Sequence, residues 1–221
     1  MKLWSGNLNT NKILQRASQE IKSGQVINLG IGLPTTLIEH LADDLDVFIH
    51  SENGILGSWK KANRKQASSS LIDAGGAYVT NRIGSSFFDS AVSFAIIRRG
   101  KLDLSILGAF EVDERGNLAN WKIPGRFSPG IGGAMELAQK TKNVIVLCAH
   151  NDKHGNSKIL KNCKLPLTAS CCVNRIITDR AVMDVTKDGL VLREISKDIT
   201  LEKLLIQTEA NLIIPESIGY F

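Results

Sequence analysis

Residues 25–54, QVINLGIGLPTTLIEHLADDLDVFIHSENG, contain the pattern that decides the fold class. The apolar segment 25–29 is typical of a short buried strand, and a glycine-rich turn follows it. Pro34 stands where the first residue of a helix over 35–44 would lie, and the segment 45–51 is again typical of a buried strand. A strand, a helix and a strand joined by short links predict a parallel sheet covered by helices.

The rest of the chain continues this alternation of helices and strands. Apolar spacing predicts a helix over 9–23, and the apolar segments 102–110 and 143–150 are expected to be buried strands. No internal repeat or interdomain linker interrupts the pattern. The sequence therefore predicts an α/β fold in a single domain over 1–221, with an open, mainly parallel sheet and flanking helices.

Three other segments carry more local expectations. The polar stretch 58–70 is expected to form a surface loop or a mobile flap. A helix is expected within 85–100, with Ser85 or Ser86 as its N-cap. The segment 181–195 predicts a β-hairpin.

The composition is that of a globular protein that can bury a sizeable core. Of 221 residues, 43% are hydrophobic and 22% are charged. No apolar run approaches the ~18 residues of a membrane span, and the N-terminal segment lacks the apolar core of a secretory signal. We therefore expect a cytoplasmic protein with no membrane partner. None of the four cysteines forms a C-x-x-C pair, so we expect reduced thiols and no metal site.

The charge of the chain suits a polyanionic partner. The net charge is +5 and the isoelectric point is about 9.0, which fits a phosphorylated cofactor or a nucleic acid. The basic residues are scattered, however, and aromatic residues make up only 5% of the chain. With no nucleic-acid-reading motif, we expect no nucleic-acid partner.

Three short stretches carry candidate functional residues. Glu52 follows a predicted strand and precedes an Asn-Gly pair. It is either a solvated turn residue or a group held beyond the carboxyl end of a strand, where open α/β sheets bind ligands. Gly30 and Gly32 either bring backbone amides to an anion or only permit a tight turn. Gly132 and Gly133 either present amides to a developing oxyanion or belong to a flexible loop.

Several motifs occur in an order that points to a known family. They are NLGIGLP (28–34), SENGILG (51–57), GIGGAMEL (130–137) and VNRIITD (173–179). Together they resemble the B (beta) subunit of class I coenzyme A transferases, of the 3-oxoacid and butyrate–acetoacetate type. The resemblance extends over almost the whole chain and implies the corresponding fold.

The resemblance also implies which residues act. Glu52 matches the nucleophile, and Asn28 is similar to an asparagine that contacts coenzyme A. Gly133 and Ala134 match residues whose backbone amides lie near the thioester. A carboxylate can attack an acyl-CoA thioester and then be attacked by the released thiolate, which leaves a Glu52–CoA thioester for a second carboxylic acid. In this ping-pong exchange coenzyme A is a substrate and covalent intermediate, and neither a metal nor a permanently bound cofactor is required.

The family pattern further implies partners and leaves alternatives open. The implied partner is a separate A-type (alpha) subunit, in a heterodimer or heterotetramer, and the substrates are an acyl-CoA and a short-chain or 3-oxo acid. Gly76 stands where many relatives have a lysine that helps to hold coenzyme A, and Asn81–Gly84 replaces a Leu-Pro-Gly segment. Arg82 is either a partner for a polar group on the acid or an exposed arginine. The alternative functions are an acyl-CoA hydrolase and a noncatalytic ligand-binding subunit.

Overall fold

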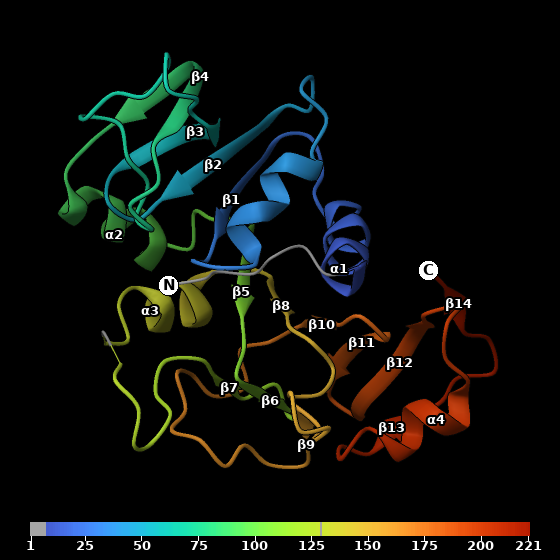
Figure 1. Cartoon of the computed structure of the whole chain (residues 1–221). Coiled ribbons are helices and arrows are strands. Elements are labelled where there is room, and N and C mark those ends of the chain that lie inside the picture. Colours follow the sequence, from blue (N-terminus) through green and yellow to red (C-terminus); the bar gives the residue numbers. More distant parts are fainter. Residues whose placement is uncertain (1–7, 129) are drawn as a thin grey trace.

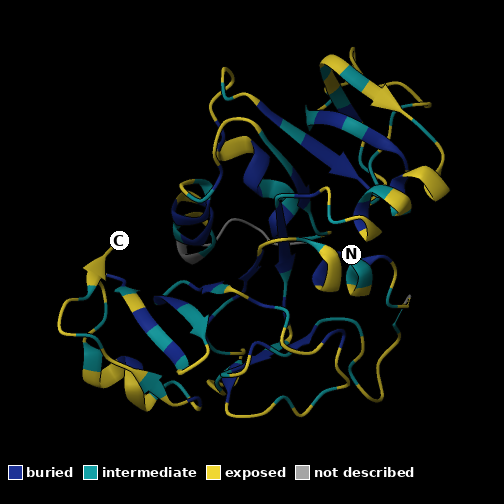
Figure 2. Ribbon diagram, turned by 180° about the vertical axis from the view of Figure 1, so that it is seen from behind, coloured by how far each residue is buried: buried dark blue, intermediate teal, exposed yellow. Residues whose placement is uncertain are grey.

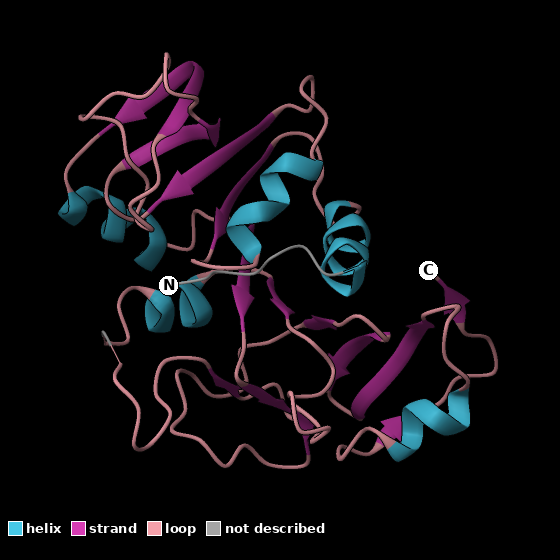
Figure 3. Cartoon of the chain, in the orientation of Figure 1, coloured by secondary structure: helices cyan, strands magenta, loops and turns pink. Residues whose placement is uncertain are grey.

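The structure, a computed structural model, describes residues 8–128 and 130–221, with only the backbone for residues 8 and 9. It consists of short helices packed on a mainly parallel sheet (Figure 1, Figure 3). The helices are α1 (Leu8–Ser18), the 3₁₀ helix η1 (Pro34–His40), α2 (Ser90–Arg98), α3 (Ala134–Lys140) and α4 (Leu201–Ile206). Within the described ranges, none of the helices combines the length and apolar character needed to cross a bilayer.

The centre of the main sheet is formed by five parallel strands in the order β10–β8–β5–β1–β2. Their bounds are β1 (Gln25–Leu29), β2 (Val47–Ser51), β5 (Leu104–Gly108), β8 (Val144–Leu147) and β10 (Arg175–Ile177). Parallel strands covered on both faces need apolar residues throughout, as β5 and β8 have. The parallel sheet predicted from strand, helix and strand is confirmed.

Antiparallel strands extend this sheet on both sides. Next to β2 lie β3 (Ile55–Lys61) and β4 (Val79–Phe87), and next to β10 lie β11 (Ala181–Thr186) and β12 (Gly189–Ile195). The short strands β13 (Leu212–Ile213) and β14 (Gly219–Tyr220) pair with β12. A separate three-stranded sheet contains β6 (Glu111–Asp113), β7 (Leu118–Ala119) and β9 (Ile159–Leu160).

The N-cap of α2 differs from the sequence prediction. Ser85 and Ser86 both lie in β4, which continues to Phe87. The helix begins after Asp89, whose carboxylate accepts a hydrogen bond of 2.8 Å from the Val92 amide. The prediction was wrong because pairing with β3 keeps the two serines extended, which leaves the cap to the next residue with a suitable side chain.

Two other elements are shorter or longer than expected. The helix predicted over 35–44 is a 3₁₀ helix that ends at His40. The hydroxyls of Thr35 and Thr36 each donate to the carbonyl three residues earlier, which suits the tighter turn. The polar stretch 58–70 begins as strand rather than loop, because β3 pairs with β4 as far as Lys61.

Side chains of the central strands alternate between two apolar layers. Ile27 packs with Leu14 of α1 and Leu37 of η1 on one face of the sheet. Its neighbour Val26 packs with Ile97 of α2 on the other face. The central strands are accordingly buried along most of their length (Figure 2). Burial on both faces fixes the carboxyl ends of β1 and β2, where the candidate residues lie.

A buried ion-pair network joins α1 to the far side of the sheet. Arg16 is 7% exposed and donates two hydrogen bonds of 2.6 Å to the carboxylate of Glu194 in β12. It donates a third, of 2.7 Å, to Glu20, which also accepts from Arg175 of β10 at 2.7 Å. Paired guanidinium–carboxylate contacts of this kind specify geometry as well as contributing energy.

The turn between β2 and β3 requires glycine at its third position. Glu52, Asn53 and Gly54 form this turn, and Gly54 has a φ of +115°. A Cβ atom on Gly54 would lie 1.9 Å from the carbonyl oxygen of Phe88, whose amide donates to the Gly54 carbonyl at 3.0 Å. The backbone that carries Glu52 is therefore pinned against the start of α2.

Replacement of Arg16 by alanine is expected to lower the free energy of unfolding by about 3 kcal/mol, because it leaves two largely buried carboxylates without their cation. Denaturant unfolding at neutral pH measures this loss. Lys12→Ala is the control, since it breaks an exposed ion pair with Asp198 and is expected to cost only about 0.5 kcal/mol. Equal losses in the two variants would show that the network adds nothing beyond a surface pair.

Replacement of Gly54 by alanine is expected to destabilise the chain by about 4 kcal/mol or more, because the new methyl group collides with backbone. Gly155→Ala is the matched control, since Gly155 also has a positive φ of +88° but no atom within 4 Å of an added Cβ. The control is expected to cost about 1 kcal/mol. Thermal unfolding of both variants compares the two costs, and similar values would mean that the turn yields at little cost.

Candidate active site

The candidate residues from β1 and β2 lie in one row at the carboxyl end of the sheet. Asn28 of β1 is paired in register with His50 of β2, and the two strands run parallel. Since side chains alternate along a strand, His50 and the residue two positions later, Glu52, leave β2 on the same side. That side faces α2 and the start of α3, because His50 contacts Ser93 and Glu52 contacts Gly133.

The structure brings Glu52 and Gly133 together, although 81 residues of sequence separate them. Gly133 is buried, and a Cβ atom on it would lie 3.4 Å from Glu52 Oε1. The same Cβ would lie 3.2 Å from the ring of Phe94 in α2. A residue with a side chain at this position would therefore crowd the carboxylate. Ala134 follows directly as the first residue of α3.

The surroundings of Glu52 increase its affinity for a proton. Burial raises the pKa of its carboxyl above the ordinary value of 4.5, and the negative charge of Asp73 acts in the same direction. Hydrogen bonds from Asn28 and from the backbone of Glu52 itself oppose this shift. A half-buried carboxylate in such a position is less solvated, and hence more reactive, than an ordinary surface glutamate.

Asn28 has one half of its side-chain amide satisfied and the other half free. Its Nδ2 donates to the carbonyl oxygen of His50 at 3.0 Å. Its Oδ1 is buried and has no hydrogen-bond partner among the described residues. Leaving a buried acceptor unpaired costs about 1–3 kcal/mol. This cost has a functional explanation if a donor on a ligand completes the site.

Two polar residues of this site were not identified from the sequence, His50 and Ser93. His50 is 1% exposed, and its Nε2 lies 2.9 Å from the hydroxyl of Ser93 in α2. Burial lowers the pKa of His50 to about 4, so the imidazole is neutral at physiological pH. The two-residue periodicity of β2 could have placed His50 beside Glu52, but no sequence signal links β2 to Ser93.

A loop between β3 and β4 packs over the turn that contains Glu52. The Asn53 side chain donates to the carbonyl of Ile72 at 2.8 Å, and the Ala74 amide donates to the hydroxyl of Ser51 at 2.9 Å. Gly76, at the tip of the loop, is exposed with a φ of +80°. The position is therefore shaped for glycine, and it offers no cation to a ligand.

The glycine turn after β1 is needed for packing. The Gly30 amide donates to the carbonyl of Ile106 at 2.8 Å, and a Cβ on Gly30 would lie 3.0 Å from the side chain of Leu107. Gly32 has a φ of +105°. Both glycines thus meet a conformational requirement of the tight turn.

Arg82 is occupied by contacts within the chain. Its guanidinium lies 3.8 Å from the centroid of the Trp59 ring and donates to the carbonyl oxygens of Asp43 and Leu45. These contacts join β4 to the segment before β2. Of the two roles open for Arg82, they favour a structural one over pairing with a substrate.

Comparisons with known proteins agree with this arrangement. The family model described as Coenzyme A transferase matches residues 10–207. The B-type chain of a probable succinyl-CoA:3-ketoacid coenzyme A transferase from Bacillus subtilis (strain 168) is 44% identical over 207 residues, which cover 94% of this chain and 96% of that protein. The beta chain of the acetate CoA-transferase from Haemophilus influenzae is 44% identical over 204 residues, which cover 92% and 91% of the two chains.

A solved structure shares the fold. An acyl-CoA transferase from Escherichia coli O157:H7, described as a thioester complex with CoA, matches with a TM-score of 0.75 and 24% identity. The match covers 100% of this chain and 44% of that longer chain. The resemblance read from the sequence motifs is confirmed by the family model and by relatives that match almost from end to end. The chain belongs to the coenzyme A transferase family, as a beta-type subunit.

Proposed function

We propose that the chain is the nucleophile-bearing subunit of an enzyme that moves coenzyme A between an acyl-CoA and a carboxylic acid, through a covalent Glu52–CoA thioester. The observation that carries the proposal is the placement of the Glu52 carboxylate against Gly133, beyond the carboxyl ends of the parallel strands. Ligands of open α/β sheets bind at that edge. The thioester complex named for the solved relative supports the same chemistry.

The reaction proceeds by two exchanges at carbonyl carbon. A carboxylate oxygen of Glu52 bonds to the acyl carbon, the carbon–sulfur bond breaks, and coenzyme A leaves as the thiolate. The thiolate then attacks the Glu52 carboxyl carbon of the mixed anhydride, and the first acid leaves as its carboxylate. A second carboxylate reverses both steps and departs as the new acyl-CoA. A glutamate suits this chemistry because it acts first as nucleophile and then as electrophile.

Backbone amides at the start of α3 are suitably free to stabilise the charge that develops on the thioester oxygen. The Gly133 amide makes no hydrogen bond to another described residue, and the Ala134 amide makes only a long one, 3.4 Å, to the carbonyl of Ile131. Both are therefore available to an oxyanion. The unpaired Oδ1 of Asn28 can accept an N–H group of the pantetheine arm, which would satisfy the buried atom.

The relatives guide the proposed substrates and partners. Their names refer to acetate and to 3-ketoacids, which supports a short-chain or 3-oxo acid as acceptor. They are named as B-type or beta chains, which supports a complex with the A-type subunit in the cytoplasm. We further propose that the chain acts as one domain and that coenzyme A, as substrate, is the group it holds during turnover.

Replacement of Glu52 by glutamine is expected to reduce the exchange rate of the complex with the A-type subunit by about 10³-fold or more, because the nucleophile is removed. The wild-type complex, incubated with acyl-CoA alone, is expected to gain the mass of coenzyme A on this chain. Borohydride is expected to trap the adduct at residue 52. Intact-mass analysis and peptide mapping make both measurements.

Glu216→Gln, at an exposed position with no described contact to the site, is the matched control and is expected to retain the adduct and the rate. Full activity without an adduct in the wild-type complex would overturn the covalent mechanism. Release of free coenzyme A without an acid acceptor would identify a hydrolase instead. An assembled wild-type complex that neither reacts with nor hydrolyses acyl-CoA would identify a noncatalytic subunit.

The pH dependence of the reaction is expected to follow the Glu52 carboxyl. Only the deprotonated form is a nucleophile, so kcat/KM falls as the pH drops through the pKa of Glu52, with a midpoint above 4.5. Asp73→Asn removes a negative charge that raises this pKa and is expected to move the acid limb to lower pH. The new side chain can still accept from the Ala77 amide. An unchanged limb in this variant would show that another group controls the profile.

A further inference from the structure

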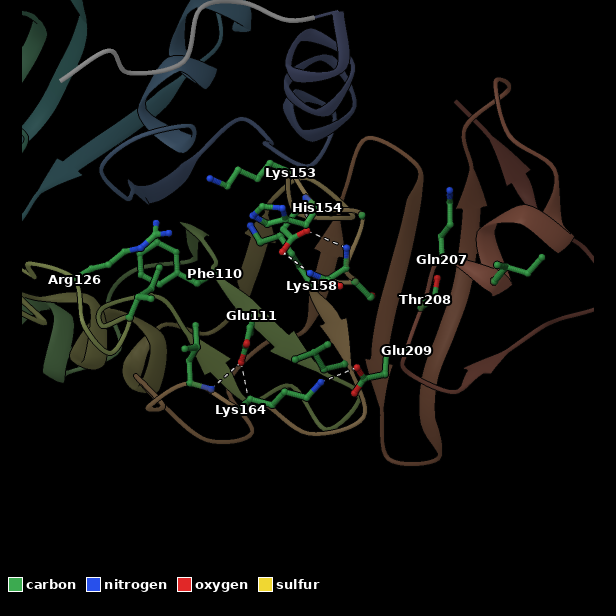
Figure 4. Close-up of a pocket in the computed structure, with 18 residues that line it drawn as sticks. Phe110, Glu111, Arg126, Lys153, His154, Lys158, Lys164, Gln207, Thr208 and Glu209 are labelled. Atoms are coloured by element: carbon green, nitrogen blue, oxygen red, sulfur yellow. Dashed lines mark hydrogen bonds and ion pairs between the residues drawn. The ribbon is translucent and has the colours of Figure 1, made fainter.

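A large depression lies near the carboxyl ends of β5 and β8, apart from the row of Asn28, His50 and Glu52. Its volume is about 850 Å³, within the ~300–1,000 Å³ range of small-molecule sites. It is formed by Phe110, the loop before α3, the segment after β8 and the residues that follow α4 (Figure 4). We propose that this depression binds the anionic nucleotide end of the acyl-CoA substrate, the 3′-phosphorylated ADP group. The inference rests on the proposed function.

The carboxylates on one side of the depression are already satisfied. Glu111 accepts hydrogen bonds from the backbone amides of Lys164 and Leu165, at 2.7 and 2.8 Å. Glu209 pairs with the ammonium group of Lys164 at 2.9 Å. Figure 4 shows these interactions along the lower wall. Neither carboxylate is left to repel an anion strongly or to pair with another cation of the pocket.

Asp152 is engaged within its own turn. Its Oδ1 accepts from the backbone amides of His154 and Asn156, at 2.8 and 2.9 Å, and its Oδ2 accepts from the Asn156 side chain at 3.0 Å. These hydrogen bonds hold the turn after β8 in place. The carboxylate is thereby committed to shaping the wall from which the neighbouring Lys153 extends.

Two cations of the depression are free. Lys158 donates to the carbonyl of Ala109 at 2.6 Å and so helps to build the floor. The side chains of Arg126 and Lys153 are exposed and make no hydrogen bond or ion pair with any other residue in the described ranges. With the acidic groups satisfied internally, these two cations give the pocket an unbalanced positive charge. Such a site favours phosphate, which Arg and Lys both bind.

The pocket also contains an exposed aromatic ring. Phe110 is 39% exposed and lines the same depression as Arg126. Aromatic rings provide stacking surfaces for nucleic-acid bases. A cationic rim together with an exposed ring suits a nucleotide better than a simple inorganic anion.

The position of the pocket fits a substrate that also reaches Glu52. Adjacent strands are about 4.8 Å apart, so β5 is about 10 Å and β8 about 15 Å from β2 across the sheet. The pantetheine arm is comparable to about four extended residues, or about 14 Å. The loop that carries Arg126 also leads directly to Gly133, the neighbour of the Glu52 carboxylate. One molecule can therefore place its thioester at Glu52 and its phosphates at the pocket.

The test compares two substrates in the complex with the A-type subunit. In the variant Arg126→Ala/Lys153→Ala, KM for acyl-CoA is expected to rise about tenfold or more per lost contact, with kcat within about twofold of wild type. Kinetics with the matching acyl-pantetheine, which lacks the nucleotide, are expected to be the same in variant and wild type. Lys187→Ala, which removes an exposed cation on the hairpin of β11 and β12, is expected to change neither substrate's kinetics.

A competitor measures the pocket separately from the chemistry. Adenosine 3′,5′-bisphosphate is expected to inhibit the wild-type complex competitively with acyl-CoA and about tenfold more weakly in the double variant. An unchanged KM for acyl-CoA in the double variant would overturn the nucleotide site while leaving the Glu52 chemistry intact. Noncompetitive inhibition would overturn it in favour of a separate regulatory nucleotide. Failure of the proposed function would differ from both, since wild type itself would then form no adduct and exchange no coenzyme A.

Discussion

The parallel pairing of β1 with β2 is the constraint on which the site depends. This register sets Asn28 beside His50, and the alternation of side chains then directs Glu52 to the same face. A shift of one residue would turn all three polar groups into the apolar layer that contains Ile27 and is covered by α1 and η1. The large cost of burying them there holds the register, so the apolar layers that stabilise the fold also aim the nucleophile.

The site retains groups that are unfavourable for stability alone. Glu52 is largely withdrawn from water, Asn28 Oδ1 is buried without a partner among the described residues, and the Gly133 amide is free within the same ranges. Each can be satisfied by a thioester, an oxyanion or an amide of the substrate. Interactions that strengthen during the reaction contribute to its rate. The rest of the fold offsets their cost through continuous apolar packing and through ion pairs such as that between Arg16 and Glu194.

Much of the fold followed from local patterns. The apolar runs predicted the central strands, and the glycine turn with Pro34 predicted the connection between β1 and η1. The N-cap of α2 was misplaced because the pairing of β4 with β3 keeps Ser85 and Ser86 extended. Long-range strand pairing overrides local capping preference, and a single sequence gives no measure of that pairing.

By itself, the sequence determined the alternation of strands and helices, the family motifs and the candidate residues Asn28, Glu52, Gly133 and Ala134. These features are local, since they depend on periodicity and on short motifs. Only the tertiary structure decided that Glu52 lies against Gly133, that His50 meets Ser93, and that Arg82 stacks on Trp59. These contacts join segments far apart in the chain, and they arise because packing layers against both faces of one sheet brings its loops to a common edge.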